Sequence, residues 1–318
     1  MGTTGIVILN YNTLEDTVRC VNSIFANTAS MEGRRVYIVD NASPDGSGKL
    51  LSSRYHGSLQ IRVLLSDRNG GFSYGNNLGI REALADGCQV IFLLNSDVYL
   101  ENDAITQMEL MMEQHPAIAT VGPRVLDREG RDIQFARKAL TFRAHLLERL
   151  PFLGDRQVRR YRYHVDEDYI FSGMVSGCCF GLRSDFVKKN QVMDDQVFLY
   201  YEEDILAHQL VRDGKKAGIC SGARVVHNEA VSTKKSVQKG RGSFERMYRW
   251  SSAVYVLKQY AGATKRQLRF IAWLNRFEWK LLSLVRKEYD ERLPQFVELL
   301  DEMTGNPHDK NQSDHTNI

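Results

Sequence analysis

The chain has 318 residues, which is enough for one large domain or two smaller ones with a sizeable core. Its composition is that of an ordinary globular protein, and 42 basic against 39 acidic residues give a net charge of only +3. The charge is uneven, because residues 234–287 hold 14 Lys and Arg but two acids, a net +12, which leaves −9 elsewhere.

The cysteines and the first residues indicate the cellular compartment of the protein. Five cysteines form no CxxC pair and stand in apolar contexts, which favours buried free thiols in a reducing compartment over disulfides or a structural metal site. No secretory signal pattern opens the chain, and no apolar stretch approaches the ~20 residues that span a bilayer. Met1-Gly2 begins like a myristoylation signal, but Ile6 stands where Ser or Thr is required. We expect a cytoplasmic protein with, at most, peripheral membrane contact.

Strand and helix patterns alternate in the N-terminal part. We expect, in chain order, a strand at 5–10, a helix at 13–25, strands at 35–40 and 61–65, a helix at 72–86 and a strand at 90–94. Thr13 is placed to cap the first helix and Gly87 to end the second. This is the spacing of βαβ units, so we predict a mostly parallel sheet with right-handed crossovers.

The pattern loosens beyond Pro116. The expected elements there are a short strand at 121–126, an irregular basic and aromatic insertion at 137–163, a strand at 176–183, a helix at 202–214 and helices from Ser243 onward. Residues 305–318 form a polar tail that we expect to be disordered.

Two glycine-rich segments resemble known phosphate loops without matching them. Gly46-Ser47-Gly48-Lys49 ends like a P-loop, but Leu50 replaces the Ser or Thr that holds magnesium. The segment 69–75 lacks the GxGxxG spacing of a dinucleotide fold. Neither an ATPase nor a dehydrogenase is favoured.

Three buried strands end in polar residues, at Asn10, Asp40 and Asn95. Open α/β sheets bind ligands at the carboxyl ends of their strands, so these residues predict a nucleotide site. Asp97, just beyond, is a candidate ligand for Mg²⁺ or Mn²⁺ together with substrate phosphates, and a turn-forming role is the alternative. Asp40 is a candidate acceptor of a hydrogen bond from a base or a ribose.

A second candidate site is the acidic run Glu202-Glu203-Asp204. Acids at a helix start are favoured by the helix dipole, which is the structural alternative. The preceding Phe198–Tyr201 segment can desolvate one carboxylate and raise its pKa towards that of a general base. His227 ends an apolar run and is a second-line candidate for metal or diphosphate contact, with a structural role as its alternative.

Over residues 5–233 the chain resembles the family 2 nucleotide-sugar glycosyltransferases, especially the rhamnosyltransferase-like branch that builds bacterial O-antigen and capsule. The resemblance lies in the order and spacing of its motifs, which are Leu9-Asn10-Tyr11-Asn12, Asp40-Asn41-Ala42-Ser43, Asn69-Gly70-Gly71-Phe72 with Asn76-Asn77-Leu78-Gly79, Asn95-Ser96-Asp97, Ser176-Gly177-Cys178-Cys179, the acidic segment 198–206 and the histidine segment 227–232. The fold that it implies is a GT-A-type α/β fold, a Rossmann-like, mostly parallel sheet flanked by helices, with a C-terminal helical extension.

The resemblance also implies roles for single residues. The residues expected to bind the nucleotide-sugar are Leu9, Tyr11, Asp40, Asn69, Asn77 and Asn95. Asp97 and His227 are expected to hold Mg²⁺ or Mn²⁺, with Asn95 replacing the first Asp of the family's metal motif. Counting back from Gly214, Glu203 falls where the family most often has its base Asp, and Asp204 and Glu202 remain alternatives.

The implied reaction is an inverting displacement. A hexosyl or deoxyhexosyl group moves from a dTDP-, UDP- or GDP-sugar to a hydroxyl of a glycan or lipid-linked oligosaccharide in cell-surface polysaccharide synthesis. We expect a catalytic domain at 1–235, with a nucleotide half at 1–115 and an acceptor half at 116–235, then a basic helical extension at 236–304 and the tail at 305–318.

Other function classes remain as alternatives. A nucleotide-sugar-binding or scaffold protein of the same fold that has lost catalysis is the main one, because of Asn95. Sugar-nucleotide pyrophosphorylases are disfavoured because no glycine-rich basic loop follows the first strand. Nucleic-acid binding through the basic region is also disfavoured.

The segment 265–287 is strongly amphipathic. A helical wheel puts Lys265, Arg269, Arg276, Lys280 and Lys287 on one face and Phe270, Leu274, Phe277, Leu281 and Val285 on the opposite one. We expect this helix to bind an anionic surface at the inner face of the cell membrane, with Trp273 and Trp279 at the headgroups. Packing of the apolar face on the catalytic domain, or in a homodimer through the C-terminal helices, is the alternative, which Glu278 favours.

Overall fold

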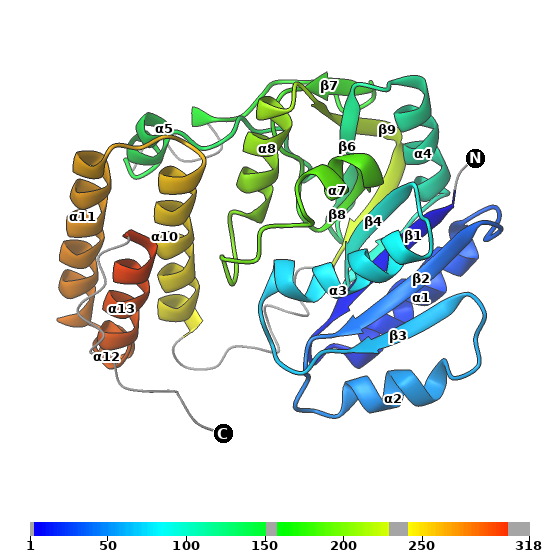
Figure 1. The fold of residues 1–318 in the computed structure, drawn as a ribbon, viewed down its shortest axis with the longest axis horizontal. Coiled ribbons are helices and arrows are strands. Elements are labelled where there is room, and N and C mark those ends of the chain that lie inside the picture. Colours follow the sequence, from blue (N-terminus) through cyan, green and yellow to red (C-terminus); the bar gives the residue numbers. More distant parts are fainter. Residues whose placement is uncertain (1–2, 151–157, 229–240, 305–318) are drawn as a thin grey trace. The chain divides into compact units, whose positions relative to one another are not determined.

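The computed structural model describes residues 3–150, 158–228 and 241–304. The chain divides into two compact units, 1–237 and 238–318. The first unit contains strands and helices, and the described part of the second contains helices alone (Figure 1).

The N-terminal unit is built on a nine-stranded sheet with the order β3-β2-β1-β4-β8-β6-β9-β5, and β7 pairs with β9 beside this path. Its strands are β1 (Thr4–Asn10), β2 (Arg34–Asp40), β3 (Ile61–Leu65), β4 (Val90–Asn95), β5 (Val98–Leu100), β6 (Ile118–Leu126), β7 (Tyr169–Phe171), β8 (Cys179–Arg183) and β9 (Lys216–His227). The strands β1 to β4 are parallel, whereas β8 runs antiparallel to both β4 and β6. The expected mostly parallel sheet flanked by helices is confirmed.

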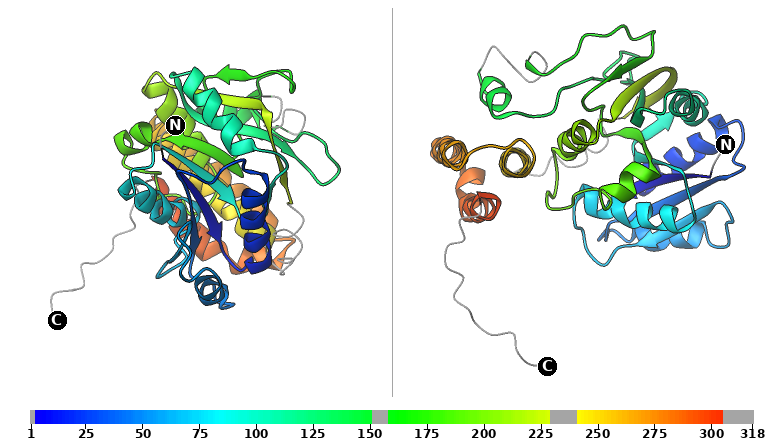
Figure 2. Two further views of the ribbon diagram at one scale, coloured as in Figure 1. Left: turned by 90° about the vertical axis from the view of Figure 1, so that its right-hand side faces the viewer. Right: turned by 45° about the horizontal axis from the view of Figure 1, so that its top comes forward.

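Helices cover both faces of this sheet (Figures 1 and 2). They are α1 (Leu14–Asn27), α2 (Ser47–Arg54), α3 (Phe72–Ala85), α4 (Ala104–Gln114), α7 (Ser184–Lys189) and α8 (Glu202–Arg212). The unit also contains the short helix α5 (Phe142–Leu147). Successive strand residues point to opposite faces, so Ile6 and Ile8 join an apolar cluster with α1, α2 and α4, and Val7 joins another with α3, α7 and α8. Because both faces are covered, the central strands are continuous apolar runs.

Most elements lie within a few residues of their expected bounds, with local differences. Thr13 stands at the N-cap of α1, but its hydroxyl makes no capping bond and instead donates to Asn10 Oδ1 at 3.1 Å. The sequence pattern gives no sign of α2, because 47–54 is short and rich in Ser and Gly. The helix α5 lies inside the insertion that was expected to be irregular, and the tail 305–318 lies outside the described residues.

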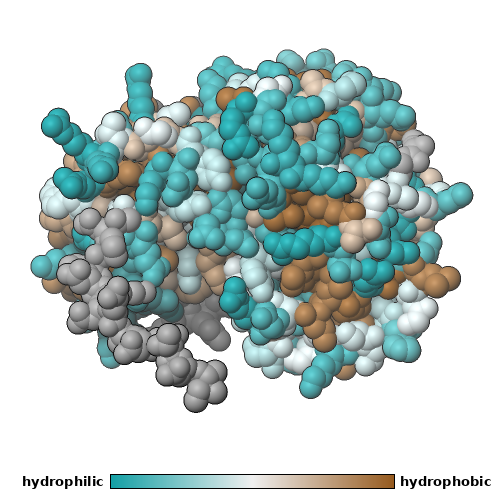
Figure 3. Space-filling view, in the orientation of Figure 1, coloured by the Kyte–Doolittle hydropathy of each residue, from teal (hydrophilic) through white to brown (hydrophobic). Residues whose placement is uncertain are grey.

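The surface seen in Figure 3 is mostly hydrophilic, with apolar residues gathered over the region of α3 and β3. This agrees with the position of β3 at the end of the strand order, where every residue is at least partly exposed. All five cysteines are buried and free, as expected. Among the helices that the structure describes, none is both long and apolar enough to cross a membrane.

The described part of the C-terminal unit consists of α10 (Arg241–Gln259), α11 (Lys265–Ser283), α12 (Lys287–Glu291) and α13 (Leu293–Thr304). Its interior is aromatic: Trp279 is fully buried, stacks on Phe296 with ring centroids 4.1 Å apart and meets Tyr289 edge-on at 4.9 Å. The expectation that Trp279 lies at a membrane surface is therefore wrong, because this side chain forms the core of its own unit.

In the N-terminal unit, α3 is joined to the segment that precedes α8. The N–H of Phe72 donates to the carbonyl of Phe198 at 3.0 Å, and the Asn77 side chain bonds the backbone N–H and C=O of Met193 at 3.0 and 2.8 Å. Gly71 permits this approach, since its φ is +91° and a Cβ there would lie 2.0 Å from the Phe198 oxygen. We call these contacts the α3–loop clamp.

The clamp predicts an unequal cost for two glycine substitutions. Gly130 is exposed, has a φ of +77° and has nothing within 4 Å of an added Cβ, so Gly130→Ala should cost only the strain of positive φ, about 1–2 kcal/mol. Gly71→Ala adds a backbone collision and the loss of the Phe72 hydrogen bond, so we expect roughly 2–5 kcal/mol in the free energy of unfolding. Urea denaturation of both variants measures this, and equal losses would mean that the clamp adds nothing.

Candidate active site

The carboxyl ends of β1 and β2 meet in a hydrogen-bonded cluster around Asn10. Asn10 and Asp40 are partners in the strand register, and Asn10 Nδ2 donates to Asp40 Oδ1 at 2.6 Å. The same amide reaches Ser47 Oγ at 2.9 Å, and Asp40 Oδ2 accepts the N–H of Ser43 at 3.0 Å. Asp40 Oδ1 also accepts from the hydroxyl of Ser47 at 3.5 Å. These contacts fix a carboxylate that is only 5% exposed, and Oδ2 keeps a second lone pair.

Three further residues expected at the nucleotide lie in or near the loops that follow the strand ends. Leu9 is partly exposed near the end of β1, Tyr11 directly follows β1 and is 42% exposed, and Asn69 precedes α3. Asn12 and Ala42 follow β1 and β2 with φ of 57°, a left-handed conformation that asparagine tolerates but that is uncommon for alanine. Such backbone outliers cluster at binding sites.

Asn77 has a different place from the one expected for it. It is fully buried, and both polar atoms of its side chain are bonded to the backbone of Met193 in the α3–loop clamp. Its geometry therefore supports the loop before α8 and leaves no polar atom for a nucleotide.

The end of β4 brings the next two predicted residues to the same edge. Asn95 donates its backbone N–H to the carbonyl of Cys178 at 2.8 Å. Asp97 is 4% exposed, and its Oδ1 lies 3.3 Å from Nε2 of His227. The two meet because β5 pairs with β9 in a register that puts Val98 opposite His227.

The Asp97–His227 pair fits a divalent cation of the expected kind. Mg²⁺ usually takes one or two protein carboxylates and completes its shell with substrate phosphates and water, and carboxylate oxygen also suits Mn²⁺. Within the described ranges no three His, Cys, Asp or Glu side chains converge as a metal cluster. Residues 229–232 of the expected histidine segment lie outside those ranges.

Among the three acids of α8, Asp204 is engaged in a buried ion pair. It pairs with Arg159, which also pairs with Glu148, and it accepts the backbone N–H of Leu140 at 2.8 Å. Burial raises the pKa of Asp204, and the charge of Arg159 opposes that rise. This carboxylate holds Leu140 and Arg159 of the insertion against α8.

Glu202 points inward. Only 5% of it is exposed, and within the described part of the chain its Oε1 has no hydrogen-bond partner. Burial, and then the neighbouring charge of Glu203, raise the pKa of Glu202 to about 8. Asp204 is buried further, at 2% exposed, but it has the guanidinium of Arg159 as a partner.

Glu203 is the partly exposed member and lies at the sheet edge. Its carboxylate presses on Gly177, where an added Cβ would lie 2.1 Å from Oε1. Burial raises the pKa of Glu203, while backbone N–H groups, including that of Gly177, and the charge of Arg137 oppose the rise. Gly177 precedes Cys178, the hydrogen-bond partner of Asn95, so Glu203 stands close to the end of β4.

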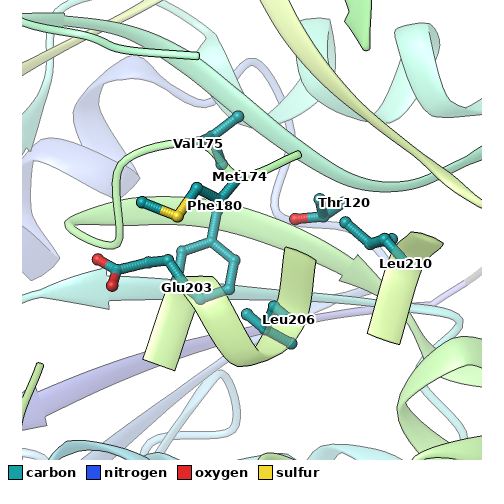
Figure 4. Close-up of a pocket in the computed structure, with 7 residues that line it drawn as sticks. All are labelled: Thr120, Met174, Val175, Phe180, Glu203, Leu206 and Leu210. Atoms are coloured by element: carbon teal, nitrogen blue, oxygen red, sulfur yellow. The ribbon is translucent and has the colours of Figure 1, made fainter. Parts of the chain in front are cut away.

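A small cavity of about 10 Å³, the size of one water, adjoins Glu203. It is lined by Thr120, Met174, Val175, Phe180, Glu203, Leu206 and Leu210. Figure 4 shows the aliphatic stem of Glu203 beside the ring of Phe180 and its carboxylate directed away from Leu206 and Leu210. The apolar wall explains why burial dominates the pKa of this acid.

The residues just before α8 have strained backbones. Tyr200 and Tyr201 have φ of 71° and 72°, and Tyr201 is the N-cap of α8. Two consecutive bulky residues in this region cost of order 1–3 kcal/mol each and persist only where surrounding contacts hold them. The α3–loop clamp, a few residues earlier, supplies such contacts.

Sequence reasoning missed two residues that shape this site, Arg137 and Arg159. Both lie in the stretch that showed no strand or helix period, and a single arginine there carries no sign of its buried partner. The register of β1, β2 and β4 brings Asp40 and Asn95 to the same end of the sheet, and the pairing of β5 with β9 puts His227 beside Asp97. Glu203 reaches this end from α8 through its contact with Gly177.

Comparisons with known proteins give the relatives of this chain. The family model for glycosyl transferase family 2 matches residues 5–190. A hexosyltransferase of low-salt glycan biosynthesis, Agl10 of Haloferax volcanii, is 24% identical over 228 residues, 71% of this chain and 67% of the relative. The glycosyltransferase GlyG of Streptococcus pneumoniae is 26% identical over 117 residues, 37% of each protein.

Solved structures show the same fold at low identity. TarS of S. aureus, residues 1–349 in complex with UDP, superposes with a TM-score of 0.53 at 12% identity over 95% of this chain and 80% of that one. GalNAc-T7 with UDP, GalNAc and Mn²⁺ has a TM-score of 0.54 at 17% identity over 72% of this chain and 44% of its own. The fold is thus the expected GT-A type, and the family model covers more than half of the sequence. The chain belongs to glycosyl transferase family 2.

Proposed function

We propose that this protein transfers a sugar from a nucleotide-diphosphate sugar to an acceptor hydroxyl with inversion at the anomeric carbon, and that Glu203 is the base. The observation that carries this is the position of Glu203. It is the one acid of α8 that is partly exposed, and it adjoins the β8 start that pairs with the end of β4.

The mechanism follows from what each side chain can do. Asp40 and the residues around it would bind the base and ribose at the ends of β1 and β2. Glu203 would remove the proton from the acceptor hydroxyl, whose oxygen attacks the anomeric carbon from the side opposite the diphosphate. A pKa raised by burial makes this carboxylate a better proton acceptor than a solvated Glu. No covalent intermediate on the enzyme is required.

Asp97 and His227 would hold Mg²⁺ or Mn²⁺ beside the diphosphate. When bound, the cation would offset the negative charge of the departing nucleoside diphosphate. Support comes from their 3.3 Å separation and from the Mn²⁺ and UDP bound in GalNAc-T7.

The donor and the acceptor are part of this proposal. UDP and UDP-GlcNAc complexes of TarS support a UDP-hexose donor, and a dTDP- or GDP-linked deoxyhexose such as rhamnose is the alternative from the motif resemblance. The named role of Agl10 in glycan biosynthesis supports a glycan or lipid-linked acceptor in cell-surface polysaccharide synthesis. A thermal-shift panel of nucleotide-sugars with Mn²⁺ tests the donor, because a ligand at 100 Kd stabilises by about 2.7 kcal/mol.

We predict that Glu203→Gln lowers kcat by ~10²–10⁴-fold, the usual scale for a lost general base, with little change in donor binding. The wild-type rate should fall at low pH with an apparent pKa above the ordinary 4.5 of Glu, because the base must be ionised and burial raises its pKa. Steady-state kinetics and calorimetric titration of the nucleotide-sugar measure the two effects.

The neighbouring acids are the matched controls. Asp204→Asn should lower the unfolding free energy, because the buried Arg159 loses one of its two charged partners. If the protein that remains folded keeps its kcat, Asp204 is structural. An inactive, fully folded Asp204→Asn beside an active Glu203→Gln would put the base at Asp204 and overturn the assignment.

Asp97→Asn and His227→Ala should each abolish the Mn²⁺-dependent part of UDP binding. Their loss removes a ligand from the cation and leaves the diphosphate without its counter-charge. Calorimetric titration of UDP with Mn²⁺ and with EDTA measures this, and Asp166→Ala, whose side chain is 84% exposed, is the control. Equal UDP binding in EDTA and Mn²⁺ would contradict the metal role.

Glu202→Gln should stabilise the protein at alkaline pH. The Glu202 pKa rises from 4.5 in the unfolded chain to about 8 in the fold, so its contribution to stability is full below pH 4.5 and is lost as pH rises through 8. The neutral Gln avoids this loss, and the gain in melting temperature over wild type should grow between pH 5 and pH 9. The exposed Glu113→Gln is the control, and a gain that is independent of pH would contradict the raised pKa.

A further inference from the structure

Helix α11 packs on α10, α12 and α13 of the C-terminal unit. The buried residues on its packed face are Leu268, Ile271, Ala272, Asn275 and Trp279. Trp279 stacks on Phe296 and donates its indole N–H to the carbonyl of Tyr289 at 2.8 Å. The interior of the unit is thus filled without the remaining large apolar residues of α11.

Those remaining residues form a second, exposed apolar face. Phe270, Trp273, Phe277 and Leu281 follow one another at spacings of three or four and are 45%, 58%, 49% and 49% exposed. Adjacent rings contact each other, with centroids 6.2 and 5.7 Å apart. Leu284, 75% exposed, continues the series. We call these five residues the aromatic stripe, and an exposed apolar patch of this extent marks an interaction site where a single residue would not.

Cations border the stripe. Arg269 and Lys280 are exposed and stand three or four residues from Trp273 and Phe277, so they lie beside the stripe on the helix surface. Together with Arg266 at the start of α11 and Arg286 three residues beyond its end, both exposed, we call them the basic row. Across the ranges that the structure describes, none of these four cations has an ion-pair partner, whereas Arg276 pairs with Asp301.

The arrangement differs from the two opposite faces expected from the helical wheel. The helix has three faces: a packed one, the aromatic stripe and the basic row next to it. The reason is that the unit needs its own apolar face for folding, and Leu268, Ile271 and Trp279 supply it. The stripe is additional.

We propose that the aromatic stripe and the basic row bind the surface of an anionic membrane, with α11 lying in the plane of the headgroups. Aromatic rings favour the membrane–water interface, and cations beside them attract anionic lipids. Of the acids, only Glu278 lies between Lys265 and Lys287, which hold seven basic residues including themselves. A second copy of the chain is a poorer partner, because joining two stripes brings two basic rows together.

Co-sedimentation of the full chain with vesicles tests this proposal. Vesicles of phosphatidylcholine with 30% phosphatidylglycerol should pellet the protein at 50 mM salt and release it at 500 mM, because salt screens the charge attraction. Vesicles of phosphatidylcholine alone should bind it at least tenfold more weakly. Both vesicles contain lipid phosphate, so the difference reports the anionic surface itself.

Two pairs of variants separate the stripe from the row. Trp273→Ala/Phe277→Ala should weaken binding at least tenfold, and Arg269→Gln/Lys280→Gln about fivefold per charge removed. The matched controls lie on the exposed surface of the other unit: Leu50→Ala/Leu59→Ala for apolar area and Arg81→Gln/Lys188→Gln for charge. Controls should bind like wild type, and all variants should keep their circular dichroism and thermal unfolding, since only exposed atoms change.

Two kinds of result would overturn the proposal. One is a full chain that does not sediment with anionic vesicles at low salt, or stripe variants that sediment like wild type. The other is a wild-type dimer in light scattering that Trp273→Ala/Phe277→Ala converts to a monomer while vesicle binding stays the same, which would assign the stripe to subunit contact. Sugar transfer to a water-soluble acceptor is measured in a separate assay. A negative result for membrane binding would therefore not contradict the proposed transfer reaction.

Discussion

Consecutive residues of an α-helix lie roughly 100° apart around its axis, and this spacing forces the three acids at the start of α8 into three different surroundings. Asp204 turns to the buried Arg159, Glu202 turns to the interior, and Glu203 turns to Gly177 at the sheet edge. From the sequence alone, any of these three adjacent acids could be the base. Helix geometry gives each acid a different role: Asp204 forms a structural ion pair, Glu202 is a buried acid, and Glu203 is the carboxylate beside the site.

The position of that carboxylate depends on contacts from the nucleotide half of the unit. The α3–loop clamp ties Gly71 and Asn77 to the loop that leads into Tyr200 and Tyr201, whose strained backbone starts α8. The same α3 begins after Asn69, beside the ends of β1 and β2. The segment expected to close over the nucleotide and the segment expected to carry the base are therefore one packed body, although they are far apart in the sequence.

The N-terminal fold could be predicted because its central strands are buried on both faces and end abruptly in Asn or Asp. The candidate site was harder to predict from the sequence. The meeting of Asp97 with His227 depends on the pairing of β5 with β9, which sequence spacing does not encode and only the family resemblance implied. Asn77 carried a binding motif but is used for packing, and Arg159 gave no signal at all. In α11, amphipathic periodicity was visible, yet it could not distinguish the apolar residues that fill the core, such as Trp279, from those that remain exposed, such as Trp273.

The account depends most on Glu203 facing the anomeric carbon from the side opposite the diphosphate. A crystal structure of the full chain with Mn²⁺ and the nucleotide-sugar that stabilises it most tests this directly. It should show the base near Asp40, the diphosphate at Asp97 and His227, and Glu203 across the sugar from the diphosphate with room for an acceptor oxygen between them. A nucleotide bound away from the ends of β1, β2 and β4, or a Glu203 on the diphosphate side of the sugar, would contradict it.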